Sequence, residues 1–375
     1  MVAAEFLDDV YKDESFFVCF LRLVITKNMF VAAICAISAL PAVATSPPPP
    51  WPFACAANTT AEEIAAPLKL HGRTVVVTGA DGRSGSAVAR AAALAGAKVV
   101  LVGRNKTRIQ DTATAIMKDL PTAQLATEIF DLGNLTDTKA GGVRLVSRFQ
   151  SIHVLVNNAG GEMEGVTTDG YATMFSVMNI APALLTDVLM PALDAAEGRV
   201  VNVGSAAGFD PLPLKHTADR MMDYARAKPT LSGGIGYGVS KFLVVHYTQQ
   251  LDAWMRARAS PARRAAGALA VNPGLFRTPP FSTTDKLACD AVMRFEPCPQ
   301  LPEQGAAGIA FAALVDGAGD APADLRLIDF ETRHGPLGLT WTQHGDSCVP
   351  RPAPKWDPAE ASKWFDLVQR AIALA

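Results

Sequence analysis

Residues 74–85 read TVVVTGADGRSG and carry the strongest local signal for the fold. A run of β-branched residues ends in a glycine-rich turn, and the alanine-rich residues 86–97 follow with helical character. A buried strand that runs through glycines into a helix is typical of the first unit of a doubly wound parallel sheet. Gly96 is expected at the C′ position that ends this helix.

Short apolar runs continue to alternate with helical patterns along the chain. Their residues suit strands buried on both faces of a parallel sheet. The sequence therefore predicts an α/β fold: a doubly wound, Rossmann-like parallel sheet in a single domain over residues 67–375. The six further strands are expected at residues 98–103, 124–131, 153–158, 199–204, 268–272 and 326–330.

Residues 1–66 differ from the rest and are expected to be a targeting leader with a proline-rich linker. The apolar run at 29–46 has the length of a signal-peptide core, and the prolines of 46–52 form a stiff spacer. We favour a cleaved signal that directs the chain to the secretory pathway and endoplasmic reticulum or to a plastid. A retained membrane anchor over 16–44 and a disordered tail are the alternatives.

Composition excludes several classes of partner. The formal net charge of −2 offers no basic surface for nucleic acid. The six cysteines contain no C-x-x-C pair, and we expect no metal site. A small molecule is the expected partner.

The glycine turn is suited to binding a pyrophosphate through backbone N–H groups, although an ordinary tight turn has the same residues. Gly79, Gly82 and Gly85 are the candidates. At the end of the second strand, where an NAD site carries an acidic residue, this chain has Arg104. Arginine pairs with a 2′-phosphate, so NADP(H) is the expected cofactor, with Arg83 as a second cation. A solvated surface arginine is the alternative for Arg104.

Tyr237 and Lys241 are four residues apart at the start of a strong helical pattern and therefore share one helix face. An ammonium beside a phenol is expected to lower the phenol's pKa and make it an acid/base group. Ser205 follows the predicted strand 199–204, where it could hydrogen-bond a substrate oxygen. An exposed helical pair and a helix-capping serine are the alternatives.

With these residues assembled, the chain from about His71 to Leu314 resembles the short-chain dehydrogenase/reductase family. The matching motifs, in order, are TGADGRSG, FDL, NNAG, MN, Ser205, the Tyr-x-x-x-Lys pair and NPG. The resemblance implies a cofactor site made of Thr78, Gly79, Asp81, Gly82, Arg83, Gly85, Arg104, Asp131, Leu132, Asn158, Ala159, Gly160, Tyr237, Lys241, Pro273 and Gly274.

The resemblance also implies a catalytic tetrad. In it Tyr237 is the acid/base, Lys241 lowers the pKa of the tyrosine and holds the nicotinamide ribose, Ser205 orients the carbonyl, and Asn179 holds a water. The cofactor carries the hydride and the protein positions it.

Features outside the motifs resemble the retinol dehydrogenase and WW-domain oxidoreductase branch of the family. That likeness implies an apolar carbonyl or alcohol substrate (retinoid-, steroid- or aldehyde-like), a lid over 275–300, and a homodimer through the helices flanking Asn179 and Tyr237. The leader itself offers a possible membrane association. A non-catalytic NADP sensor or scaffold and a light-dependent protochlorophyllide reductase are the competing functions.

Two positions depart from the family pattern. Gly204 stands where many relatives have serine, which leaves the catalytic serine position filled. Arg83 replaces the middle glycine of the turn, and Gly82 stands one place earlier. If the backbone at Arg83 needs a positive φ, its side chain crowds the pyrophosphate. Alternatively the turn shifts, Gly82 takes the permissive conformation, and Arg83 points toward the adenosine phosphate. We favour the second account because the tetrad is complete.

Overall fold

The computed structural model describes residues 59–208, 217–226, 233–258, 267–273, 302–316, 327–329, 349–351 and 356–375. The expected signal sequence, the lid over 275–300, Gly274 and all six cysteines lie outside these residues. Within the expected linker, α3 (Ala61–Ala65) begins with a capping box between Thr60 and Glu63 and packs its apolar side into the core.

All seven strands expected from the sequence are present in one sheet, in the order β3-β2-β1-β4-β5-β6-β7-β8. The strands β1 to β7 run parallel, and β8 is antiparallel to β7. Strand β8 was not predicted, because its three residues include Pro350, which is tolerated at a sheet edge but is a poor signal for a strand. The bounds are β1 Thr74–Thr78, β2 Lys98–Gly103, β3 Gln124–Ile129, β4 Val154–Asn157, β5 Arg199–Val203, β6 Ala268–Asn272, β7 Leu327–Asp329 and β8 Val349–Arg351.

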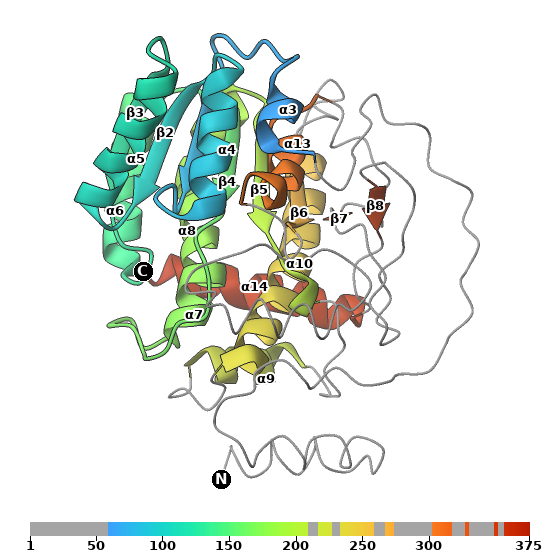
Figure 1. Ribbon diagram of the computed structural model, residues 1–375. Helices are drawn as coiled ribbons and strands as arrows, with labels where there is room; N and C mark the ends of the chain where they lie inside the picture. Colours follow the sequence, from blue (N-terminus) through green and yellow to red (C-terminus); the bar gives the residue numbers. More distant parts are fainter. Residues whose placement is uncertain are drawn as a thin grey trace, which may run out of the picture.

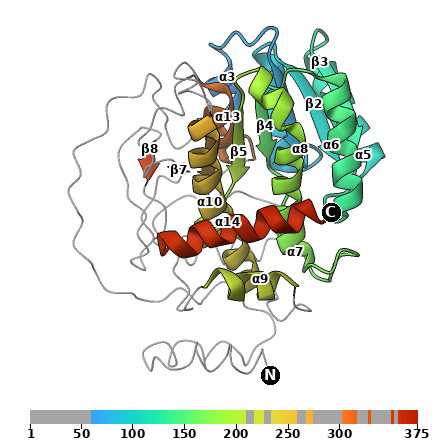
Figure 2. The same ribbon diagram turned by 180° about the vertical axis from the view of Figure 1, so that it is seen from behind.

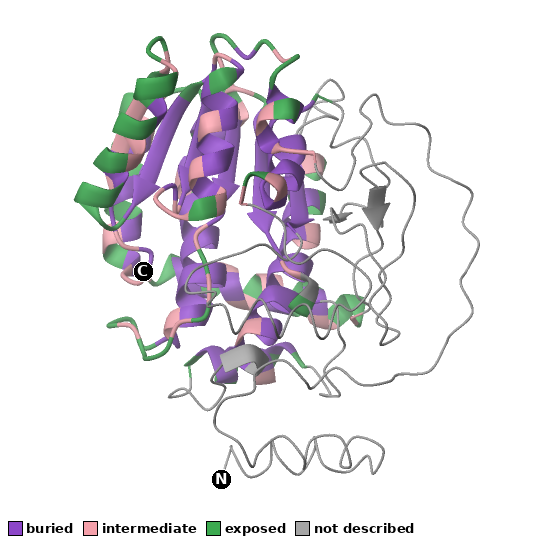
Figure 3. Ribbon diagram, viewed as in Figure 1, coloured by how far each residue is buried: buried purple, intermediate pink, exposed green. Residues whose placement is uncertain are grey.

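Helices cover both faces of the sheet. In β1, Val75 and Val77 pack on the side of α3, α4 and α13, while Val76 packs on the side of α6, α8, α10 and α14. Figures 1 and 2 show these two helical layers from opposite sides, and Figure 3 shows that strands β1, β2, β4, β5 and β6 are almost wholly buried between them. Successive residues of a strand point to opposite faces of the sheet. Because both faces are covered by helices, apolar residues are required at successive positions.

The helices follow the predicted alternation with the strands. Asn105 and Asn134 cap α5 and α6 through their side chains, and Gly96 takes φ +88° after α4, as expected for C′. The bounds are α4 Arg83–Leu94, α5 Lys106–Asp119, α6 Leu135–Arg148, α7 Thr173–Phe175, the π-helical turn η1 Ser176–Ile180, α8 Ala181–Ala195, the 3₁₀ turn η2 Ala206–Gly208, α9 Ala218–Arg226, α10 Gly233–Arg258, α12 Pro302–Gly305, α13 Ala307–Leu314 and α14 Pro358–Ala373.

The helical stretch Thr173–Ala195 is long and apolar enough to cross a membrane, and it is the one such stretch in the described part of the chain. Most of it is buried against the sheet and neighbouring helices, as in the core helix of a folded domain.

The strand order reverses between β1 and β4, since the chain proceeds from β1 toward β3 on one side and from β4 toward β7 on the other. In such sheets a crevice forms outside the carboxyl ends of the strands at this point. The glycine turn after β1 and residues 157–160 after β4 both lie there.

Candidate active site

Two glycines of the turn after β1 lie at close backbone crossings. Gly79 has φ +61°, and a Cβ added to it would lie 2.9 Å from the Cα atom of Ala159. A Cβ on Gly85 would lie 2.2 Å from the carbonyl oxygen of Gly79. No larger side chain fits either position, so the turn keeps the shape that a pyrophosphate requires.

The structure corrects our account of Arg83. Gly82 has φ −84° and is the N-cap of α4, so it does not take the permissive conformation; Gly79 takes it instead. Arg83 is the first residue of α4 and its side chain is exposed. The backbone at Arg83 has no positive φ, so the expected crowding does not arise from strain at this residue.

The amino end of α4 is suited to an anion. No side chain caps it, and its first turn contains no acidic residue. Its N–H groups and helix dipole are therefore available to a phosphate, which fits the cofactor expected from the sequence.

Hydrogen bonds fix the turn to the end of β4. The hydroxyl of Thr78 accepts from the N–H groups of Asn158 and Ala159 at 3.0 and 3.1 Å. The amide of Asn158 donates to the Thr78 carbonyl at 2.9 Å and accepts from the Ser84 hydroxyl at 2.8 Å. Ser84 was missed in the sequence, since only the fold brings it to Asn158.

Three charged residues lie around the glycine turn. Asp81 belongs to the turn, Arg104 follows β2, and Arg108 is in the first turn of α5. Arg108 lies 3.1 Å from the Asp81 carboxylate and also donates to its carbonyl oxygen at 2.9 Å. The side chain of Arg104 is exposed and has no ion-pair partner among the described residues. Arg108 was not predicted, because its partner Asp81 lies 27 residues earlier in the chain and only the fold brings the two together.

Asp131 and Leu132 follow β3, as expected for the adenine side of the site. A carboxylate oxygen of Asp131 accepts from the N–H of Gly133 at 2.9 Å, and the Asp131 N–H donates to Asp137 at 2.8 Å. Leu132 is buried.

Asn179 lies in η1, beside the helix that carries Tyr237 and Lys241. Its side-chain amide donates to the hydroxyl of Ser240 at 2.7 Å. Its side-chain oxygen is buried and has no hydrogen-bond partner among the described residues. The amide is therefore held in place while its oxygen is left to a water or a ligand.

Lys241 is buried, and its ammonium donates to the carbonyl oxygen of Val203 at 2.6 Å. Burial lowers the pKa of this group to about 8. A Cβ on Gly160 would lie 3.6 Å from the ammonium nitrogen, so Lys241 reaches the end of β4 as well as that of β5.

Ser205 and Tyr237 come together at the carboxyl end of β5, where their side chains hydrogen-bond to one another. Ser205 also accepts a 3.3 Å bond from the N–H of Ala207, as the expected capping role requires.

The pKa of Tyr237 differs from our expectation, because it is raised rather than lowered. Burial is the largest cause, the hydrogen bond from Ser205 opposes it, and the negative charge of Glu162 adds to the rise. The Lys241 ammonium lies 5.6 Å from the centre of the tyrosine ring. Glu162 was missed because nothing in its local sequence links it to a residue 75 positions away.

Tyr237 packs against a small apolar cluster. Met174, Met178 and Val244 are buried together, and Met163 and Tyr237 pack against them. Thioethers are polarisable and adapt to irregular apolar groups.

Pro273 follows β6 at the same edge of the sheet, and its neighbour Gly274 lies outside the described residues. In the described part of the chain no group of three or more His, Cys, Asp or Glu residues could hold a metal ion.

Comparisons with known proteins agree with this arrangement. Residues 73–217 match the family model described as short chain dehydrogenase. The chain is 29% identical over 256 residues to retinol dehydrogenase 12 of Mus musculus, covering 66% of this chain and 75% of that protein.

Solved structures have the same fold. A protein of Mycobacterium paratuberculosis aligns with a TM-score of 0.58 and 25% identity, covering 82% of this chain and 97% of that one. A structure from Beutenbergia cavernae, named for NAD(P)-dependent gluconate 5-dehydrogenase and containing bound NADP, aligns with a TM-score of 0.55 and 24% identity, covering 70% and 96%.

Proposed function

Because the chain belongs to the short-chain dehydrogenase/reductase family and resembles retinol dehydrogenases, we propose that it transfers a hydride between NADP(H) and an apolar carbonyl or alcohol. One observation carries this proposal. Ser205, Tyr237 and Lys241 meet at the carboxyl end of β5, beside the phosphate-binding turn.

The side chains supply the proton chemistry, while a bound nicotinamide supplies or accepts the hydride. Burial raises the pKa of Tyr237, so its hydroxyl is protonated at neutral pH and can donate a proton to a carbonyl oxygen. Ser205 hydrogen-bonds to Tyr237 and can hold the same oxygen. In alcohol oxidation the proton returns to the tyrosine oxygen.

The charges around the turn support the preference for NADP(H) over NAD(H). Arg83 and Arg104 are exposed cations near the end of β2, where a 2′-phosphate would be recognised. The carboxylate of Asp81 would repel that phosphate, but Arg108 neutralises it.

The apolar residues around Tyr237 support an apolar substrate. Met163, Met174 and Met178 come from the loop after β4 and from α7 and η1, in the apolar cluster against which the tyrosine packs. A hydrocarbon chain or ring beside the reacting carbon would replace water against these side chains.

The catalytic role is tested with Tyr237→Phe in the full chain, assayed with alkyl and aryl aldehydes and NADPH. Loss of the proton donor is expected to reduce kcat by about a thousandfold and to leave NADPH affinity unchanged. Tyr247→Phe is the matched control, because it removes a hydroxyl from the same helix. Equal activity of the two variants would refute the role of Tyr237.

The cofactor preference is tested by titrating NADPH and NADH and following nicotinamide fluorescence. Arg104→Ala is expected to weaken NADPH binding by roughly 10- to 100-fold, the loss of one charge-assisted bond, and to leave NADH binding unchanged. Lys118→Ala removes the same charge from the far end of α5. NADPH binding without turnover of any aldehyde would favour a sensor or scaffold, and turnover that requires light would favour a photoreductase.

A further inference from the structure

Helix α9 lies between Ser205 and Tyr237 in the chain, at the end of the fold where the strands terminate (Figure 1). Its apolar side is buried, with Met221, Met222 and Tyr224 in the larger core cluster. Of the described elements, α14 is the one that packs most extensively against it, and Figures 1 and 2 both show α14 beside it.

Polar contacts join α14 to the amino end of α9. A carboxylate oxygen of Glu360 accepts from the N–H of Ala218 at 2.7 Å, and this N–H belongs to a buried residue. Lys363 pairs with Asp219 on the next residue of α9. The carboxylate of Glu360 also interacts favourably with the positive end of the α9 dipole.

Next to these polar residues, α14 has an apolar face that is buried in the core and packs against α10. Trp364 is completely buried in the core cluster, and Phe365 stacks on Tyr247 of α10 with ring centres 5.2 Å apart. Gln369 donates to the Tyr247 hydroxyl at 3.5 Å. The C-terminal helix therefore connects α9 to the helix that carries Tyr237 and Lys241.

The carboxyl end of α9 supports a loop beside the active site. The carbonyl oxygen of Ala225 accepts from the N–H of Ala172 at 2.8 Å, and the guanidinium of Arg226 lies 5.8 Å from the centre of the Tyr171 ring. Tyr171 and Ala172 are the last residues of the loop 160–172. In the same loop, Met163 packs against the apolar cluster that Tyr237 also contacts.

We propose that α14 is a clasp that holds α9, and through α9 the loop 160–172, against the substrate side of Tyr237. Glu360 and Lys363 are then positioning residues for substrate binding. The kinetic part of this proposal rests on the proposed function, whereas the structural part does not. Glu360 and Lys363 make polar contacts with α9, whereas Phe365 packs on Tyr247 of α10. The contacts with α9 can therefore be removed by substitutions that leave Phe365 in place.

The test compares the double variant Glu360→Ala/Lys363→Ala with Asp366→Ala/Arg370→Ala in the full chain. The second pair makes the same charge change on exposed positions of the same helix. Loss of the clasp is expected to speed amide hydrogen exchange in both 218–226 and 160–172 by about tenfold. Glu360→Gln keeps a side-chain acceptor and should restore much of the protection.

Enzyme kinetics with aldehydes and NADPH provide the second readout. The clasp variant should raise KM for the aldehyde roughly fivefold, with kcat and NADPH affinity within about twofold of wild type. Unchanged exchange in 160–172, or an equal loss of NADPH affinity, would overturn the proposal. If the wild type turns over no aldehyde, the proposed function fails, and the exchange data alone decide whether the clasp exists.

Discussion

The ammonium of Lys241 donates a 2.6 Å hydrogen bond to the carbonyl oxygen of Val203, the last residue of β5. Ser205 follows two residues later, so this contact ties α10 to the strand end that carries the serine. It also keeps a cation in a buried position, which has a cost for stability.

That cost predicts a pH-dependent difference between wild type and Lys241→Met. The unfolded chain keeps the lysine proton up to its ordinary pKa of 10.5, whereas the folded chain releases it from about pH 8. Wild-type stability should therefore rise with pH between these values, by about 3 kcal/mol in total, while that of the variant should not. Urea unfolding at pH 7, 8.5 and 10 measures the unfolding free energy of both proteins. If burial of the ammonium destabilises the wild type, the unfolding free energy of Lys241→Met minus that of the wild type is largest at pH 7 and falls as the pH rises. A difference that does not change with pH would contradict a buried ammonium of lowered pKa.

Glu162 should tune the acid/base step. Its carboxylate contributes to the raised pKa of Tyr237, so Glu162→Gln is expected to lower that pKa and move the alkaline rise of alcohol oxidation to lower pH. Because Glu162 is exposed, the shift should disappear at high salt. Glu164→Gln, two residues away and also exposed, is the control and should leave the pH profile of oxidation unchanged. Identical profiles for the two variants would exclude a role for Glu162.

A chain of buried polar groups links α8, β4, β5 and α10. Asn157 donates to Asn202 at 2.9 Å and to Thr186 at 3.3 Å, and Asn202 donates to Thr248 at 2.9 Å. Replacement of Asn202 by Leu leaves buried partners unsatisfied at both ends, and we expect a loss of about 2–4 kcal/mol in unfolding free energy. Thr186→Val breaks the longest of these bonds, together with the local 2.7 Å bond from the Thr186 hydroxyl to the carbonyl oxygen of Pro182, and should cost about 1 kcal/mol. If chemical denaturation shows that Asn202→Leu and Thr186→Val lose the same unfolding free energy, Asn202 does not have the central place in this network that the contacts indicate.

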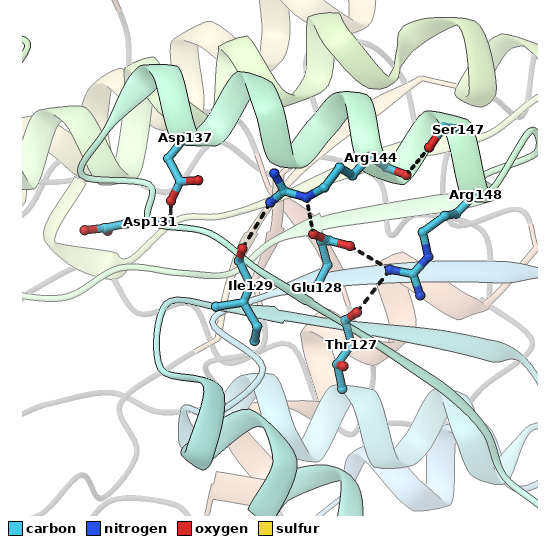
Figure 4. Close-up of polar contacts among 8 residues, drawn as sticks. All are labelled: Thr127, Glu128, Ile129, Asp131, Asp137, Arg144, Ser147 and Arg148. Carbon is cyan, nitrogen blue, oxygen red and sulfur yellow. Dashed lines mark hydrogen bonds and ion pairs between the residues drawn. The ribbon is translucent and has the colours of Figure 1, made fainter.

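The free edge of β3 is covered by two arginines of α6 (Figure 4). Arg144 and Arg148 lie 2.7 and 2.6 Å from the buried carboxylate of Glu128. They also donate to the carbonyl oxygens of Ile129 and Thr127 at 3.1 and 3.2 Å. The side chains thus block an edge that could pair with another strand.

Removing both arginines should destabilise the fold and promote association. We expect Arg144→Ala/Arg148→Ala to lower the unfolding free energy by about 2 kcal/mol, since a buried carboxylate loses both partners. Light scattering on warming should also increase earlier than in wild type. Lys118→Ala/Lys139→Ala removes two exposed cations and serves as the control. Scattering and stability equal to this control would contradict the edge-blocking role.

Local patterns in the sequence determined the strands β1 to β7, the helix after the glycine turn, and the order of the site motifs. A run of apolar residues buried on both faces, or a glycine needed at a tight crossing, is visible within a few residues of chain. Even so, the sequence did not reveal which glycine of the turn takes the positive φ. Gly79 takes it, at the point where the end of β4 approaches so closely that a Cβ would meet Ala159.

Only the tertiary structure decided the contacts between distant residues. The raised pKa of Tyr237 depends on burial and on Glu162, the neutralisation of Asp81 depends on Arg108, and the support of α9 depends on Glu360. These interactions join elements that are far apart in the chain or lie on different faces, and their energies depend on distance and desolvation. A periodic pattern in the sequence contains neither the distance between two residues nor their degree of desolvation. The sequence therefore determined the architecture and the candidate residues, while packing set the pKa shifts of those residues and the contacts that hold them in place.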